Sequence, residues 1–255
     1  MLSESCAALV HGTLVGMNAS RTARGRARAE LTQEIKNEAR RQLAVDGAQK
    51  LSLRSVAREL GMVSSALYRY FASRDELLTA LIIDAYDAVG EQAEQAAEGG
   101  AKGGAPRERW RKACHAVRDW ARANPHEYAL IYGSPIPGYA APQDTVASAA
   151  RVPMVLIKIL RETNPSPAFE GPPLTEGLAG QLRALGEQVA PDGERIAPDL
   201  PLETLNRGIV VWTQLFGMLS FELFGQFVGS VDPTDEFFDH TVEQLADFLG
   251  LPPTR

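Results

Sequence analysis

Three side chains between residues 64 and 70 have the types and the spacing that contacts with DNA require. Ser65 carries a hydroxyl, Tyr68 a phenol and Arg69 a guanidinium, and helical geometry would place them on one side of a short segment. Hydroxyl and phenol groups bond to phosphate oxygens, and a guanidinium also pairs with the edge of guanine in the major groove. This chemistry is useful only if a helix presents the three side chains to solvent.

Two short helices joined by a turn at Gly61 would position these side chains. Ser52 can cap the first helix, and Ser64 stands where the second helix needs an N-cap oxygen. The residues expected to face the core recur at helical spacing: Leu53, Val56, Ala57 and Leu60 in the first helix, and Ala66, Leu67 and Tyr70 or Phe71 in the second. Gly61 allows the left-handed backbone that ends a helix. The pattern predicts a helix-turn-helix.

The helices on either side of this motif are also predicted from caps and periodicity. A helix over about 29–46 should end at Gly47, with one apolar face made by Leu31, Ile35, Ala39 and Leu43. Ser73 and Glu76 form a capping box, and a long helix from Arg74 to about Ala97 should follow it. This last helix would connect the motif to the rest of the chain.

The segment from about Ala29 to Val89 resembles the tetracycline-repressor (TetR) family of bacterial transcription regulators. The matching residues are Gly47, Leu53, Val56, Ala57, Leu60, Gly61, the run Leu67-Tyr68-Arg69-Tyr70-Phe71, and the run from Ser73 to Leu78. The family usually has a threonine at the position of Ser52 or Leu53, and Ser52 can still act as a cap.

The resemblance implies a role for each candidate DNA-binding residue. Arg54 would contact phosphate or base at the edge of the groove. The residues that would face base edges are Ser64, Ser65, Ala66 and Arg69, with Ala66 offering apolar contact to a thymine methyl. The residues that would hold phosphates are Tyr68, Tyr70 and Arg74.

Charge is distributed unevenly along the 255 residues, whose net charge is −6. Residues 21–74 carry twelve Lys or Arg against five Asp or Glu, whereas residues 75–255 carry fourteen against twenty-six. A basic head on an acidic body would concentrate the attraction to phosphate at one end. Residues 1–28 are expected to be a disordered arm whose arginines suit the minor groove, or a solvated tail, with Met17 as an alternative start.

The remainder of the chain is predicted to be helical throughout, which makes the fold all-α. A DNA-binding domain is expected over 29–89, with its helix-turn-helix over 52–71, and a C-terminal domain over 90–255. A glycine-rich joint over 98–105 lies close to the boundary between them. Helices are expected over about 106–123, 126–132, 143–163 with a kink at Pro153, 175–189, 202–228 and 235–249.

The second half resembles the C-terminal domain called WHG in TetR-like regulators. The matching residues are Trp120, Pro125, Tyr128, the run from Tyr132 to Tyr139, Trp212, Gly217, Glu222 and Gly225. Phe216 stands where that pattern has histidine, so no role of the histidine carries over.

Two sites are expected in this helical body. A pocket for a small apolar or aromatic effector would use Trp110, His115, Trp120, Tyr128, Tyr132, Met154, Trp212 and Phe216, although ordinary core packing explains any one aromatic equally well. A homodimer interface on the last two helices would use Val211, Leu215, Leu219, Leu223, Phe227, Phe238 and Leu245.

Other function classes find little support in the residues. The chain has no GxSxG, HExxH, P-loop or dinucleotide motif, and its four His and two Cys show no metal-ligand spacing, so we expect neither an enzyme nor a cofactor. Gly208 to Val231 is long enough to cross a membrane, but Glu222 lies within it and favours burial. Two cysteines fit a reducing cytoplasm.

The sequence thus predicts a cytoplasmic, ligand-responsive homodimer that binds a palindromic double-stranded DNA operator, most simply as a repressor. One alternative is a DNA-binding dimer without a ligand, whose C-terminal half only pairs the chains. A second is a small-molecule enzyme built on the helical body, which would need a pocket with paired titratable groups.

Overall fold

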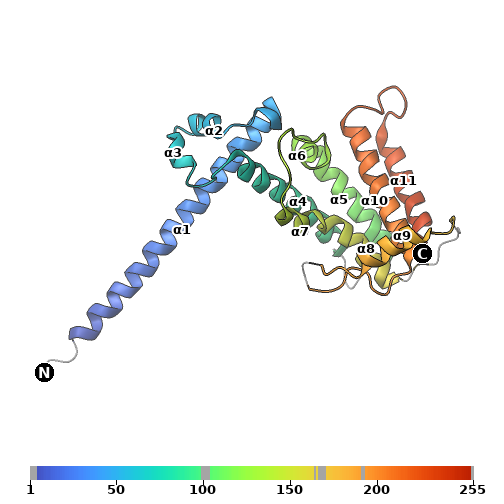
Figure 1. Ribbon diagram of the computed structural model, residues 1–255, viewed down its shortest axis with the longest axis horizontal. Helices are drawn as coiled ribbons and strands as arrows, with labels where there is room; N and C mark the ends of the chain where they lie inside the picture. Colours follow the sequence, from blue (N-terminus) through green and yellow to red (C-terminus); the bar gives the residue numbers. More distant parts are fainter. Residues whose placement is uncertain (1–4, 99–103, 164, 166–170, 191–192, 254–255) are drawn as a thin grey trace. The chain divides into compact units, whose positions relative to one another are not determined.

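The computed structural model describes residues 5–98, 104–163, 165, 171–190 and 193–253, with side chains described from residue 23 onward (Figure 1). Throughout this part of the chain the regular elements are helices, apart from one isolated bridge between Val189 and Arg195. The all-α fold predicted from the sequence is confirmed. Contacts divide the chain into a first unit that ends at Leu81 and a second that begins at Ile82.

The first unit begins with one long helix, α1 (Ser5–Asp46). This helix begins before the predicted start near Ala29; the arm expected over 1–28 stays a prediction, and residues 1–4 lie outside the described part. No proline and only isolated glycines interrupt residues 5–28, so a helix formed over 29–46 can extend backward residue by residue. Its end at Gly47, which has a φ of 77°, is as predicted.

Four short elements complete the first unit around a small core. They are η1 (Ala48–Lys50), α2 (Leu53–Glu59), α3 (Ser64–Leu67) and the first turns of α4 (Arg74–Glu98). Their buried side chains are Ile35, Ala39, Leu43, Leu51, Leu53, Val56, Ala57, Leu67, Phe71, Leu77, Leu78 and Leu81. The apolar positions that the sequence placed at helical spacing in this unit are therefore largely the ones that fill its core.

Helix α4 passes from the first unit into the second. The predicted capping box is present in one half: the Glu76 N–H donates to Ser73 Oγ at 3.1 Å, whereas the Glu76 carboxylate accepts from the N–H of Ala72 instead of that of Ser73. Four residues on the later turns of α4 belong to the core of the second unit: Ala85, Val89, Ala93 and Ala97. The unit boundary thus lies before the predicted one at residue 89, and residues 99–103 of the predicted joint lie outside the described part.

The second unit, here called the body, is a bundle in which α5 (Pro106–Ala123), α10 (Leu202–Leu223) and α11 (Thr234–Leu249) lie side by side (Figure 1). Two buried arginines tie these helices together. Arg107 binds Glu243 at 2.7 Å and Asp247 at 2.6 Å, and Arg118 binds Glu222 at 2.7 Å. Because α10 ends at Leu223 and Gly225 has a φ of 79°, the predicted extension of this helix to Val228 is wrong.

The remaining helices pack around this bundle. They are α6 (Pro125–Tyr132), α7 (Val146–Ala149), α8 (Arg151–Thr163) and α9 (Glu176–Gly186), with η2 (Gln143–Thr145) before α7. The continuous helix predicted over 143–163 is broken at Ala150, three residues before the expected kink at Pro153. A proline ring clashes with the carbonyl four residues earlier, which here belongs to Ala149, the last residue of α7.

Within the described residues, we find no helix with the length and apolar character needed to span a lipid bilayer. The segment 208–231 is divided between α10 and the turns that follow it, and Glu222 is half-buried against Arg118.

Candidate nucleic-acid interface and effector site

The turn at Gly61 has the hydrogen bonds of a Schellman motif. The Met62 N–H donates to the Ala57 carbonyl at 2.8 Å, and the Gly61 N–H donates to the Arg58 carbonyl at 3.1 Å. Gly61 has a φ of 65°, a conformation that residues with a Cβ rarely adopt. The turn is therefore fixed by its backbone and sets the direction of α3.

Helix α3 is short and presents a polar outer face. Ser64 and Ser65 on α3 are exposed, as are Tyr68 and Arg69 in the turn that follows it, and Ala66 is half-buried. Leu67 and Phe71 are buried beneath them and hold the helix in the unit's core. The predicted N-cap role of Ser64 is wrong: the cap residue is Val63 and Ser64 is the first helical residue, so its hydroxyl stays on the outer face.

The predicted DNA-binding arginines Arg54 and Arg74 differ in how many of their N–H groups remain available. Arg54 is exposed on α2. Arg74 is half-buried and donates to the carbonyls of Leu51 at 3.1 Å and Ala48 at 2.8 Å. Its guanidinium therefore ties the start of α4 to the turn before α2, and fewer of its N–H groups remain for a phosphate than the sequence suggested.

Arg28 of α1 contacts two residues that directly follow α3, and sequence reasoning missed this contact. Its guanidinium donates to the Arg69 carbonyl at 3.1 Å and lies 4.9 Å from the centre of the Tyr70 ring, a cation–π contact. Arg28 thus supports the end of α3 instead of belonging to a free arm. Forty-one residues separate the two partners, so no local spacing could have revealed the pairing.

In the body, most of the aromatic residues predicted to line a pocket pack against one another. The Tyr132 ring lies 4.2 Å from the Phe216 ring and 5.2 Å from the Tyr128 ring, centre to centre. The Tyr128 hydroxyl donates to the Phe216 carbonyl at 2.9 Å, and burial raises its pKa to about 12. Trp120 is also buried in the core. For these four residues, core packing is what the structure shows.

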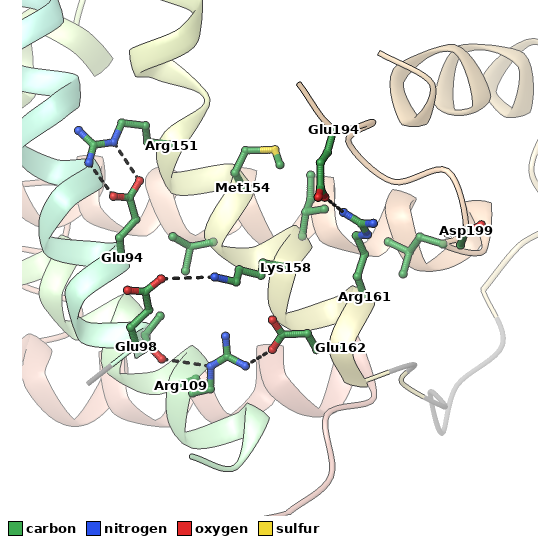
Figure 2. Close-up of a pocket in the computed structure, with 14 residues that line it drawn as sticks. Glu94, Glu98, Arg109, Arg151, Met154, Lys158, Arg161, Glu162, Glu194 and Asp199 are labelled. Carbon is green, nitrogen blue, oxygen red and sulfur yellow. Dashed lines mark hydrogen bonds and ion pairs between the residues drawn. The ribbon is translucent and has the colours of Figure 1, made fainter. Parts of the chain in front are cut away.

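A cleft of about 910 Å³ lies between α4, α5 and α8, and its lining is charged (Figure 2). Met154 is the predicted pocket residue that lines it. The four cations of the lining each face a carboxylate: Arg151 faces Glu94, Lys158 faces Glu98, Arg109 faces Glu162 and Arg161 faces Glu194. The cleft is therefore bridged by ion pairs, and with Asp199 as a fifth carboxylate it has no excess of positive charge that would select an anion.

A second, smaller cavity of about 20 Å³ is apolar and lies in the bundle. Trp110 and Trp212 line it, so two of the predicted pocket residues meet there. The Trp110 N–H donates to the Val242 carbonyl at 3.0 Å, whereas the Trp212 N–H is buried without an acceptor. His115 lies elsewhere, in an open groove where its Nε2 is 3.3 Å from Asp239. The predicted pocket is thus not a single site.

Comparison with known proteins decides the family. The family model for bacterial regulatory proteins of the tetR family matches residues 35–81, and the one for the tetracyclin repressor-like C-terminal domain matches residues 110–245. The chain belongs to the TetR family. It is 37% identical over 215 residues to the HTH-type transcriptional regulator Rv1816 of Mycobacterium tuberculosis, covering 79% of this chain and 84% of that one.

Solved structures agree with this assignment. The crystal structure of the regulatory protein SCO4313 matches with a TM-score of 0.70 and 34% identity, covering 87% of this chain and 97% of that one. The TetR family regulator PfmR from Thermus thermophilus shares the fold, with a TM-score of 0.50 and 18% identity over 87% of this chain and 99% of that one. The chain is accordingly a DNA-binding transcriptional regulator with an N-terminal helix-turn-helix.

In this TetR-family body, most residues of the predicted dimer interface are covered by their own chain. Val211, Leu215, Leu219 and Phe238 are buried within their own body, and Leu223, Phe227 and Leu245 are half-buried against its core. Helix α10 has apolar residues on more than one face, and the sequence does not tell which face is covered internally. The exposed apolar residues of this region are Val210, Phe221, Phe224, Val228 and Phe237, here called the exposed apolar stripe.

Proposed function

We propose that this TetR-family regulator is a homodimeric repressor that binds a palindromic operator and is released by a small-molecule effector. The exposed outer face of α3, fixed by Gly61 on one side and by Leu67 and Phe71 beneath, is the observation that carries the DNA-binding part. In a two-fold dimer the two copies of α3 would enter major grooves about one helical turn apart, ~34–36 Å. Because a repressor must reach the chromosome, we expect the protein to act in the cytoplasm.

The residues on and around α3 that would face DNA, here called the reading face, have distinct roles in this proposal. Arg69 reads a guanine, while Ser64, Ser65 and Ala66 lie against neighbouring base edges. The residues that bind phosphate are Arg54, Tyr68, Tyr70 and Arg74, and they fix the register on the duplex. Arg28 supports the reading face from behind, through the Arg69 carbonyl and the Tyr70 ring.

Arg69→Ala tests the readout. We expect operator affinity to fall by about 1–3 kcal/mol for each half-site, with relaxed preference at one base position, because a bidentate arginine–guanine pair is lost. The operator would be selected from random duplexes, and affinity and base preference would be measured by fluorescence anisotropy. Arg183→Ala removes the same charge from α9 of the body and should change neither quantity. Unchanged base preference in Arg69→Ala would refute the assignment.

Arg24 and Arg26 are exposed on α1 and should contribute electrostatic attraction. Replacing both with alanine should weaken operator binding and flatten its salt dependence, with the log–log slope falling by about 0.9 for each phosphate contact that is lost. The measurement is the operator dissociation constant across a salt series. The double variant Arg183→Ala/Arg195→Ala carries the same charge change in the body. If the Arg24→Ala/Arg26→Ala variant keeps the wild-type slope, as the control should, then Arg24 and Arg26 do not contact DNA.

The effector part of the proposal rests on the body and on α4. Helix α4 is shared by the two units. An effector that displaces the part of α4 after Leu81 would therefore change the position of the helix-turn-helix. To act as an inducer, the effector must favour one dimer state; a coupling of ~1–3 kcal/mol changes operator affinity by roughly 5–150-fold. A dimer that binds DNA without any effector is the second candidate, and the close packing of Tyr128, Tyr132 and Phe216 favours it.

Direct measurement separates these two candidates. Operator affinity would be measured with and without a panel of small apolar compounds, at fixed protein concentration and fixed salt. A compound that lowers affinity reproducibly supports the inducible repressor. The regulator without an effector predicts that no member of the panel changes affinity. In both cases we infer that the protein has no enzymatic activity, because both family models that match it describe regulatory proteins.

A further inference from the structure

Trp212 has a polar group that its surroundings do not satisfy. Its indole N–H is buried and has no hydrogen-bond acceptor, and it is the sole buried side-chain nitrogen or oxygen in this condition in the described part of the chain. Burying such a donor loses its bonds to water and gains none in return. The other tryptophan of the same cavity, Trp110, donates to the Val242 carbonyl at 3.0 Å. The difference singles out Trp212.

The surroundings of Trp212 are almost wholly apolar. The cavity that it lines has a volume of about 20 Å³ and is bordered by Ala93, Trp110, Ala113, Cys114, Val117, Val152, Pro153, Val155, Leu156, Ile159 and Leu215. A space of this size is comparable to one water molecule, but a buried water needs two to four polar partners. Since the lining offers almost no polar atoms, water is a poor match for this site.

An uncharged, largely apolar molecule with one hydrogen-bond acceptor matches both features. Its carbon skeleton would lie against the aliphatic lining, and its oxygen would accept from Trp212. We propose that Trp212 is the polar anchor of an effector site in the bundle, and that this site takes small apolar ketones, esters or related molecules with a single acceptor. The inference rests on the proposed effector-controlled function and names the chemical class of the effector.

The walls of the cavity connect this site to α4. Ala93 is a wall residue on α4 itself, and Val152 and Pro153 are wall residues on the first turn of α8. The residue before them, Arg151, binds Glu94 at 2.6 Å (Figure 2). It also donates to the Asp87 carbonyl at 3.0 Å.

Gly90 allows α8 to approach α4 this closely. A Cβ at Gly90 would lie 2.6 Å from the Arg151 Cβ, so the two helices touch at that point. A molecule larger than the present cavity must separate these walls. Its binding would therefore press on α4 both directly, through Ala93, and through the first turn of α8 and its Arg151 contacts.

The test uses the full-length protein and two probes of similar size. Cyclopentanone has an acceptor, and cyclopentane has none. The three tryptophans give three indole N–H signals in a proton–nitrogen correlation spectrum, and Trp212→Phe identifies the signal of Trp212. We expect cyclopentanone to move this signal downfield in a saturable manner, and cyclopentane to leave it without a downfield shift. A Trp212 signal that does not respond to cyclopentanone overturns the proposal.

Calorimetry on variants provides the second arm. Trp212→Phe keeps an aromatic ring and removes the donor, so cyclopentanone should bind roughly 2- to 13-fold more weakly, the range expected for one net hydrogen bond. Trp120→Phe makes the same change at a buried tryptophan that does not line the cavity, and should leave binding unchanged. Ala113→Val reduces the cavity and should weaken binding while Trp212 remains. Equal binding by the wild type and Trp212→Phe overturns the proposal.

Operator affinity measured with the same probe separates this inference from the proposed function. If cyclopentanone binds at Trp212 and operator affinity does not change, the site stands and control of DNA binding through it fails. If another compound releases the operator equally from the wild type and Trp212→Phe, the inducible repressor stands and the Trp212 site fails.

Discussion

If two copies pair through the exposed apolar stripe, as we propose, Phe221→Arg should convert the homodimer to a monomer and lower operator affinity by roughly 10²–10⁴-fold. Phe221 is 53% exposed on α10, in the middle of the exposed apolar stripe. An arginine at the centre of a paired apolar surface would bury two unpaired charges across the two-fold axis, which an interface does not tolerate. The loss in affinity follows because a monomer contacts one half-site, and the gain from bivalent binding disappears.

Gly217, one turn before Phe221, supports this position for the interface. It is exposed in the middle of α10, and a Cβ placed on it would meet nothing within 4 Å in its own chain. Glycine inside a helix costs about 1 kcal/mol relative to alanine. Contacts within the single chain do not require a glycine here, whereas the close approach of a second copy of the chain would.

Sedimentation velocity and operator binding measure the two expected changes in Phe221→Arg. The matched control is Val146→Arg, which places the same charge on an exposed apolar residue of α7, away from α10 and α11. It should remain dimeric with wild-type affinity. Should Phe221→Arg also sediment as a dimer, the exposed apolar stripe is not where two copies meet.

Arg118→Ala should lower the free energy of unfolding by about 3–5 kcal/mol, the loss expected when one partner of a buried ion pair is removed. Arg118 is 4% exposed and binds both oxygens of Glu222, at 2.9 and 2.7 Å. It also donates to Thr234 and lies over the Phe238 ring, so it ties α5 to α10 and α11. Removing it leaves the half-buried Glu222 carboxylate with its main partner gone.

Urea unfolding at a fixed protein concentration measures this change, because a dimer's stability depends on concentration. Arg195→Ala is the control: Arg195 is exposed, lies outside this network and pairs with Glu187 at 2.9 Å. Its loss should cost about 0–1 kcal/mol, as for surface ion pairs. The double variant Arg118→Met/Glu222→Leu should recover much of the lost stability by removing both charges. Similar stabilities for the two alanine variants would contradict the assigned role of Arg118.

The helix-turn-helix was predictable because the residues that determine it lie close together in the sequence. The glycine at position 61, the capping box at Ser73 and Glu76, and the 3.6-residue spacing of apolar side chains are all visible within short windows. Local backbone chemistry therefore predicted most helix ends, and the exposed positions of Ser65, Tyr68 and Arg69. The helix before the motif was predicted too short, since nothing in residues 5–28 stops a helix from extending.

Tertiary structure decided which apolar face of each body helix is covered and which polar groups meet. Val211 and Leu215 have the same residue types as an interface would use, yet they are buried internally, while Phe221 and Val210 remain exposed. The Arg28–Arg69, Arg118–Glu222 and Arg151–Glu94 contacts join residues far apart in the chain. Helical periodicity identifies an apolar face but not its partner, because the partner is set by packing between distant segments. For that reason the sequence alone determined the family and its reading helix, and only the folded body revealed the unpaired Trp212 donor and the exposed apolar stripe.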